Sequence, residues 1–214
     1  MKTYNDDIGR IYVTPKGNYY SVTTMLGATS DRTWLEEWKE RVGEDEANQR
    51  MHIGASFGEL FHQFCQNYLE GNPLPKTSNF IVIQSFNNAK SFLDKHVTKL
   101  IGCEVPLYSE TLQLAGRADA IVEWDGVNTV LDFKLLSDIF PADEHLDYML
   151  QATCYAMMIK ERMNMICKQN VIFMMPRGGR TPQIDKRPNH VFFGELARRI
   201  KLFRKQIEER NVSH

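Results

Sequence analysis

Cysteine is scarce in this chain, and its four copies are scattered. Cys65, Cys103, Cys154 and Cys167 form no Cys-x-x-Cys pair, and no His/Cys cluster has the spacing of a zinc site. Isolated thiols of this kind favour reduced, mostly buried side chains over a metal centre. The sequence therefore predicts neither a zinc site nor an iron–sulfur cluster.

Long apolar runs, internal repeats and linker-like tracts are missing as well. No stretch approaches the run of about 18 apolar residues that a membrane span needs. The first ten residues are polar and acidic, where a secretory signal would be basic and then apolar. We therefore expect one domain over residues 1–214 in an intracellular, cytoplasmic protein, with a monomer favoured and no membrane partner.

The net charge is close to zero, but the charges are unevenly distributed. The chain carries 26 Lys and Arg against 27 Asp and Glu. Residues 160–214 hold 13 Lys and Arg against 5 Asp and Glu, so this segment is +8 and the remainder is −9. Such asymmetry favours a polyanion-facing surface joined to an acidic part that could hold cations. A solvated helix face accounts equally well for the basic segment.

The hydrophobic periodicity predicts an α/β protein with a mixed β-sheet flanked by helices. Strands are predicted over residues 10–14, 19–22, 104–108, 112–124, 129–135, 170–175 and 190–193. Helices are predicted over residues 31–42, 45–70, 81–100, 143–164 and 195–210. In this division, residues 1–50 form an N-terminal hairpin and helix extension. Residues 51–214 form the core, which ends in a basic helix.

The dipeptide Asp125-Gly126 is a strong signal for a β-hairpin. If these two residues form the whole turn, residue i faces residue 251 − i, which sets Asp119 opposite Asp132 and Arg117 opposite Lys134. A four-residue loop would shift the pairing by two residues. In both registers the four side chains share one face, while the apolar residues 131, 133 and 135 anchor the other.

Carboxylates on opposed strand positions repel each other, because their Cβ atoms lie only about 5 Å apart. A raised carboxyl pKa, a partner such as Lys134, or a divalent cation would offset that repulsion. Two carboxylates and an ammonium suit phosphodiester hydrolysis: Asp119 and Asp132 can hold Mg²⁺ or Mn²⁺, and Lys134 can stabilise the transition state. The alternative is a structural salt bridge between Asp132 and Lys134 at the surface, without a catalytic role.

Four short motifs in order resemble the RecB-like branch of the PD-(D/E)XK nucleases. They are Gly58-x-x-x-His62, Gly116-x-x-Asp119, Asp132-x-Lys134 and Gln151-x-x-x-Tyr155. The N-terminal pattern, with Tyr20-Ser-Val-Thr-Thr24 and Leu35-x-x-Trp38, is most similar to phage exonucleases and the mitochondrial genome maintenance exonuclease. The resemblance covers residues 10–155. It implies a restriction-endonuclease-like core of order α-β-β-β-α-β.

The resemblance also implies a role for each matched residue of the metal site. Asp119 and Asp132 would bind the metal together with the backbone carbonyl of Phe133, His62 would complete the metal shell, and Lys134 would be the catalytic lysine. His62 also stands at the edge of a helical apolar face, about 100° from its apolar neighbour, where it can be half-buried and still reach a cleft. An ordinary satisfied histidine is the alternative there.

Two further residues differ from, or could supplement, the family pattern. Relatives commonly carry a glutamate four residues after the histidine, where this chain has Gln66. Because an amide binds Mg²⁺ less well than a carboxylate, a second metal supported from this helix is in doubt. Glu104, on the first core strand, is a candidate carboxylate to compensate.

The remaining candidates concern DNA. Gln151 and Tyr155 are implied to lie beside the metal and to position DNA or the lysine. Tyr148 lies one turn earlier on the same helix face, and helix amphipathicity explains this spacing too. The residues proposed to contact DNA are Tyr148, Arg177, Arg180, Arg198 and Arg199. A solvated helix face explains the two arginines at 198 and 199 nearly as well.

The sequence thus predicts a Mg²⁺- or Mn²⁺-dependent deoxyribonuclease, an exonuclease that acts on single-stranded DNA ends. The threading of one strand past the metals is implied by the resemblance, as is a phage origin with action in a bacterial host. A structure-specific endonuclease is one alternative. The other is a catalytically idle nucleic-acid-binding or recombination accessory protein that keeps the fold.

Overall fold

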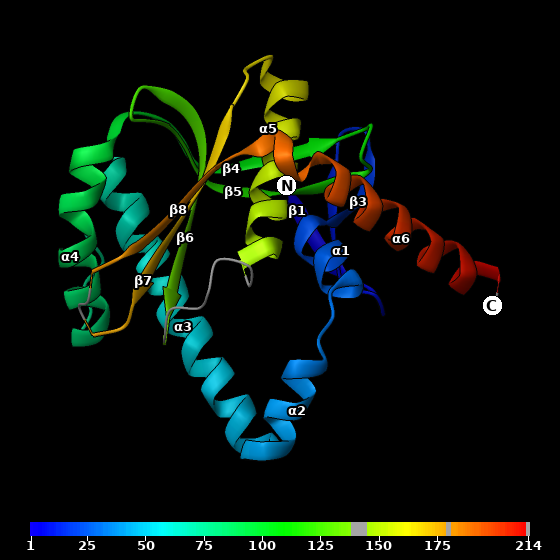
Figure 1. Ribbon diagram of the computed structural model, residues 1–214, viewed down its shortest axis with the longest axis horizontal. Coiled ribbons are helices and arrows are strands. Elements are labelled where there is room, and N and C mark those ends of the chain that lie inside the picture. The colour runs from blue at the N-terminus through cyan, green and yellow to red at the C-terminus, as the bar shows by residue number, and fades with distance from the viewer. Residues whose placement is uncertain (138–144, 179–180, 213–214) are drawn as a thin grey trace.

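The computed structural model describes residues 1–137, 145–178 and 181–212, which form an open mixed β-sheet flanked by helices (Figure 1). The strands are β1 Lys2–Asn5, β2 Arg10–Thr14, β3 Gly17–Ser21, β4 Val97–Ser109, β5 Leu114–Trp124, β6 Val127–Leu136, β7 Gln169–Pro176 and β8 Gln183–Pro188. The helices are α1 Val22–Thr29, α2 Thr33–Val42, α3 Glu44–Leu69, α4 Phe80–His96, α5 Leu146–Met163 and α6 Phe193–Val212, with a 3₁₀ turn at Asn189–Phe192. None of the described helices combines the length and apolar character needed to cross a membrane.

Strand β5 is the branch point of the sheet. The strand order is β1-β2-β3-β5-β6-β7-β8, and β4 pairs with β5 along nearly its whole length, off this path. On the opposite edge of β5, the parallel strand β3 pairs only with Leu114 and Ala115, and the antiparallel strand β6 pairs with Ala120–Trp124. In the described structure, the stretch 116–119 of β5 therefore has no strand partner on that edge.

The β5–β6 hairpin has the predicted register. Its pairs run from Trp124–Val127 to Ala120–Leu131, which confirms the two-residue turn. Asp125 and Gly126 both have positive φ, at 51° and 79°, as a tight hairpin turn requires. Beyond the last pair, β5 continues beside β4 and β6 continues beside β7, so the two strands separate (Figure 1).

Two apolar clusters cover the two faces of the sheet. On one face, α3 and α4 pack against alternate residues of β6 and β7, including Leu131, Phe133 and Phe173. On the other face, α1, α5 and α6 pack against Ile172, Met174 and their neighbours. The prediction that residues 131, 133 and 135 of β6 share a buried face is confirmed. Asp132 and Lys134, at the intervening positions, lie near α5.

Several predicted boundaries were wrong. The helix predicted over 81–100 ends at His96, because Val97–Ser109 pairs with β5 as one long strand. The strand predicted over 190–193 is the 3₁₀ turn and the start of α6, and the strand that pairs with β7 is Gln183–Pro188. Because β8 is an edge strand with mostly polar residues, it carries no alternating apolar signal. The first residues of the predicted helix 143–164, residues 143 and 144, lie outside the described residues.

Two N-terminal elements were missed or misjudged. Val22–Thr29 is the helix α1 although it opens with β-branched residues, because Ser21 caps it and its Val22, Met25 and Leu26 side chains are buried. The helix α2 buries none of its residues, and Trp34 is 65% exposed. Together, α2 and the first half of α3 project from the body, and we call residues 33–56 the α2–α3 arm (Figure 1).

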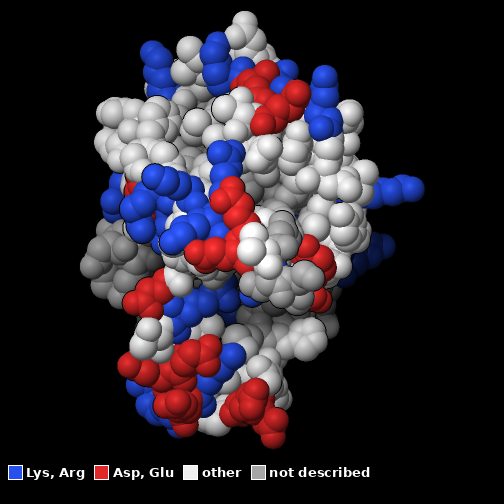
Figure 2. Space-filling view, turned by 90° about the vertical axis from the view of Figure 1, so that its right-hand side faces the viewer, with Lys and Arg blue, Asp and Glu red and all other residues white. Residues whose placement is uncertain are grey.

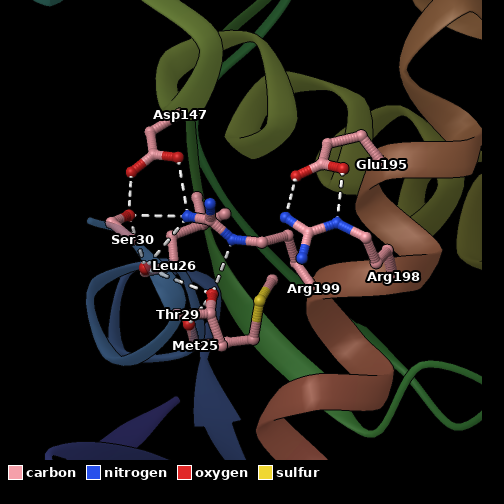
Figure 3. Close-up of polar contacts among 8 residues, drawn as sticks. All are labelled: Met25, Leu26, Thr29, Ser30, Asp147, Glu195, Arg198 and Arg199. Atoms are coloured by element: carbon pink, nitrogen blue, oxygen red, sulfur yellow. Dashed lines mark hydrogen bonds and ion pairs between the residues drawn. The ribbon is translucent and has the colours of Figure 1, made fainter.

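A single buried guanidinium joins three helices. Arg199 of α6 is 6% exposed and donates to the hydroxyls of Thr29 and Ser30, at 2.7 and 2.6 Å, and to the carbonyl of Leu26, at 3.2 Å (Figure 3). It also pairs with Asp147 of α5 at 2.8 Å. The α1 partners belong to the last turn of that helix, where free carbonyls favour a cation. Arg199 therefore fixes α6 to both α1 and α5.

This network predicts very different effects for two adjacent arginines. Arg199→Ala should lower the free energy of unfolding by about 2–3 kcal/mol, because it leaves several buried partners without their donor. Arg198 is the matched control: its side chain is 61% exposed and pairs with the surface residue Glu195, so Arg198→Ala should cost less than about 1 kcal/mol. Urea unfolding measures both, and equal small losses would contradict a structural role for Arg199.

Candidate active site

The candidate site lies where β5 and β6 separate. Just past the last backbone pair, the Oδ2 of Asp119 accepts a hydrogen bond from the backbone N–H of Phe133 at 3.0 Å. The carboxylate thus continues the link between the strands after their ladder ends. Its side chain is largely buried, and Asp119 is the last residue of the stretch of β5 that has no strand partner on that edge in the described structure.

Asp132 and Lys134 form a buried ion pair beside it. Asp132 is 2% exposed, and its Oδ2 lies 2.5 Å from the Lys134 Nζ. In the described part of the chain, no donor makes a well-oriented hydrogen bond to either oxygen of Asp132. Burial raises the pKa of Asp132 to about 6, against the lowering effect of Lys134. Lys134 thus offsets the cost of burying this carboxylate in part, and a bound cation would stabilise its charged form further.

Lys134 is held as an ammonium between a carboxylate and an aromatic ring. Burial lowers the pKa of Lys134, but Asp132 and Asp119 more than offset this, so its pKa is raised overall. The Nζ lies over the ring of Tyr148, 4.9 Å from its centre, within the range of a cation–π contact. His145 stacks on the same Tyr148 ring with the centres 6.3 Å apart, and its Nδ1 lies 3.4 Å from Asp185. Tyr148 therefore contacts the lysine in this structure.

His62 reaches the site from α3. Its Nδ1 lies 3.4 Å from the Asp119 Oδ2, and its ring meets the ring of Phe133 edge-on at 6.1 Å. The side chain is half-buried, as the helical position predicted. The structure thus brings together His62, Asp119, Asp132 and Lys134, which are 72 residues apart at the extremes of the sequence.

Gln151 and Tyr155 close the site from α5. The Gln151 Nε2 donates to the Tyr155 hydroxyl at 3.5 Å, and Tyr155 is buried. Burial, together with the nearby Asp119, raises the pKa of this hydroxyl well above its usual range. The Tyr155 ring lies against Gly116, where a Cβ atom would come within 2.6 Å of the ring. The motif glycine is therefore required by the close approach of a motif tyrosine.

The neighbouring charged residues are arranged differently from the predicted hairpin. Arg117 does not face Lys134, because the β5–β6 ladder ends before it. Arg117 instead pairs with Glu104 of β4 at 2.5 Å. Burial raises the pKa of Glu104, and the nearby Asp119 adds to this effect. Glu104 therefore borders the site, whereas the amide of Gln66 contacts Glu70 one turn further along α3.

The donor set can be compared with what a metal ion requires. In the part of the chain that the structure describes, no three His, Cys, Asp or Glu side chains lie close enough together to hold an ion. The groups that face Asp132 and Asp119 are the ammonium of Lys134 and the imidazole of His62. Oxygen and imidazole donors of these kinds fit Mg²⁺ or Mn²⁺. The Asp132 oxygens support that fit, because no donor in the described structure makes a well-oriented hydrogen bond to them. A role for the Phe133 carbonyl is implied by the resemblance alone.

The residues predicted to contact DNA do not form one surface. Arg199 is a correction: its guanidinium is buried and engaged by α1 and α5, so it is not available to a phosphate (Figure 3). Arg198 is exposed but paired with Glu195. Arg177 lies over the ring of Phe57 at 5.2 Å, beside α3, and Arg180 lies outside the described residues. Of the three described arginines in this set, Arg177 lies against the helix that carries His62.

The surface beside the C-terminal end of α6 carries both signs of charge. Figure 2 shows Lys and Arg side chains in its upper and middle parts and a concentration of Asp and Glu at its lower end, at the level of the α2–α3 arm. Basic and acidic side chains are thus interspersed on this face, which is not continuously basic in this view.

Comparison with known proteins does not identify the chain. A scan against family models finds no match, and a search of curated proteins finds no significant relative. The fold and site define an α/β protein with a buried aspartate–lysine pair in a divided sheet.

Sequence reasoning missed the support behind Lys134. His145 stacks on the Tyr148 ring and in turn contacts Asp185. Asp185 belongs to β8, a strand that was not predicted. The i, i+3 spacing of His145 and Tyr148 was the signal that could have found the first contact. Nothing in the sequence pattern indicated the second.

The two motif glycines predict opposite outcomes. Gly116→Ala should lower the free energy of unfolding by about 1–3 kcal/mol, because its Cβ would overlap the Tyr155 ring. Gly58 is the control: it is helical with no atom within 4 Å of an added Cβ, so Gly58→Ala should be neutral or stabilise by up to about 1 kcal/mol. Urea unfolding compares them. If Gly116→Ala proves as harmless as Gly58→Ala, Tyr155 does not pack on β5.

Proposed function

We propose that this protein is a metal-dependent deoxyribonuclease of the RecB-like PD-(D/E)XK type, built on a restriction-endonuclease-like core. The observation that carries the proposal is the buried carboxylate of Asp132, which has no well-oriented hydrogen-bond donor in the described structure and lies between Lys134 and Asp119. Such a perturbed group at a break in the sheet is typical of a functional site.

The alternative, a surface salt bridge between Asp132 and Lys134 with no catalytic role, does not fit this geometry. Asp132 is buried, and its partner Lys134 is mostly buried too. A buried ion pair is often no more stable than apolar residues of similar size, because both charges lose their hydration. Stability alone therefore gives no reason to keep two carboxylates and an ammonium together here.

The proposed mechanism assigns one task to each residue. Asp132 and Asp119 would hold Mg²⁺ or Mn²⁺ with help from His62, and the bound ion would lower the pKa of a water and neutralise phosphate charge. Lys134 remains protonated and is positioned by Asp132 and by the Tyr148 ring. Its ammonium can stabilise the charge that develops on the phosphate in the transition state.

Single-stranded DNA is the proposed substrate. On the projecting α2–α3 arm, Trp34 offers an exposed aromatic face, and such faces stack with unpaired bases. Arg177, beside α3, has a buried Nε without an acceptor in the described part of the chain, which suits a phosphate contact. A structure-specific endonuclease and an idle accessory protein remain the alternatives.

Removal of the buried pair should abolish cleavage. Lys134→Met and Asp132→Asn should each reduce cleavage of end-labelled single strands by at least about 10²–10³-fold in Mg²⁺ or Mn²⁺. DNA binding in Ca²⁺ should survive in Lys134→Met. The matched control is Lys90→Met, which breaks an exposed Lys–Asp pair on α4 with Asp94 and should leave the rate unchanged.

Two results would contradict this assignment. Full turnover by Lys134→Met would remove the lysine from the mechanism. Wild-type protein that binds DNA but shows no cleavage stimulated by metal and blocked by EDTA would favour the idle accessory protein.

The need for a free end separates the exonuclease from the endonuclease. A linear single strand should be degraded, while a circular single strand of the same sequence should resist, because a threaded strand must enter by its end. Gel analysis of both forms with equal enzyme measures the difference. A matched linear strand with both ends blocked serves as the control, and digestion of the circle at the linear rate would favour the endonuclease.

A further inference from the structure

A cavity of about 910 Å³ lies at the end of β6 that is remote from the candidate active site. It is formed where β6 and β7 begin and where α5 and β8 end, next to the start of α6. On β6, Val127 of this cavity and Asp132 of the candidate active site are five residues apart, which corresponds to about 17 Å along a strand. A ligand in this cavity would leave the candidate active site open.

The floor of this cavity is apolar and exposed. Its apolar lining consists of Val127, Ala156, Met157, Ile166, Cys167, Pro188 and Phe193. Ile166 is 57% exposed and Phe193 is 44% exposed, although both are large apolar side chains. Apolar residues gathered in an exposed hollow with a polar rim are typical of a binding site.

The rim of the cavity is basic. Lys160, Lys168, Lys186 and Arg187 line it, and none of its described lining residues is acidic. Lys186 and Arg187 each face a carboxylate outside the lining. Lys160 bonds only to the Asn164 amide oxygen, and no carboxylate in the described structure pairs with Lys160 or Lys168. The hollow therefore combines an apolar floor with uncompensated positive charge.

We propose that this cavity binds an acidic segment of another protein, with one apolar side chain of that segment seated on the floor. Carboxylates that flank an apolar side chain match both features, whereas a nucleic acid matches only the charge. Most of the lining is not aromatic: Phe193 and His190 are the aromatic side chains among its described residues, whereas a run of stacked bases needs a series of aromatic platforms. The inference does not depend on the proposed nuclease activity.

The test uses a short fluorescein-labelled peptide with a central Leu-Phe pair flanked by Asp and Glu residues. The full chain should bind it saturably in fluorescence anisotropy, and added salt should weaken binding. Lys160→Glu combined with Lys168→Glu should raise the Kd by about ten-fold or more, because attraction becomes repulsion. Ile166→Asp should have a similar effect, because it removes the apolar floor.

Matched controls separate this cavity from general charge effects. Lys201→Glu combined with Lys205→Glu reverses two basic residues of α6 outside the cavity and should leave the Kd unchanged. A peptide with Ser-Ser in place of Leu-Phe should not bind. Because the substituted side chains are exposed, each variant should keep the wild-type unfolding midpoint.

Several outcomes would overturn the proposal. Absence of peptide binding, equal binding of the Ser-Ser peptide, or equal weakening by the α6 control pair would each do so. Competition by a single-stranded oligonucleotide that depends on Lys160 and Lys168 would make the cavity a nucleic-acid surface. Self-association that is lost in the Lys160→Glu/Lys168→Glu variant would mean that the cavity binds an acidic part of a second copy, such as the α2–α3 arm.

Discussion

The hydrogen bond from the Phe133 N–H to the Asp119 carboxylate marks the point on which the rest of the site depends. It lies one step beyond the last β5–β6 backbone pair, where the two strands leave each other for β4 and β7. A continuous ladder would have paired this part of β5 with backbone. The separation instead leaves room for side chains from helices on opposite faces of the sheet: His62 of α3 lies 3.4 Å from the Asp119 carboxylate, and the Tyr155 ring of α5 packs against Gly116.

The site keeps charged side chains in a buried position, where the loss of hydration is unfavourable. Asp132 is buried among groups that only partly compensate its charge, and its pKa is raised in consequence. Lys134 stays charged because two carboxylates face it. Unfavourable charge held by a rigid sheet is what a preorganised catalytic centre requires, since the groups need not reorganise during the reaction. This is the physical basis for the proposed nuclease, and it is independent of the family resemblance.

The basic C-terminal part of the chain serves more than one purpose. Arg199 is an internal tie between helices, and Arg198 is paired on the surface. Lys160 and Lys168 border a cavity remote from the candidate site. The charge asymmetry in the sequence therefore did not by itself locate a DNA surface. Neighbouring residues of a helix point in different directions, so one basic side chain can be buried while the next is exposed, as Arg199 and Arg198 are.

The sequence by itself determined the hairpin and the position of its turn, because Asp125-Gly126 readily adopts the positive φ angles of a tight turn, and the resulting ladder runs as far as the pair Ala120–Leu131. It also determined that His62 stands at the edge of an apolar helix face. Only the tertiary structure decided where the ladder ends, why Gly116 must lack a side chain, and that Arg199 is buried. These features depend on α5, α6 and β8 packing against residues far away in the chain, and local periodicity contains no information about such contacts.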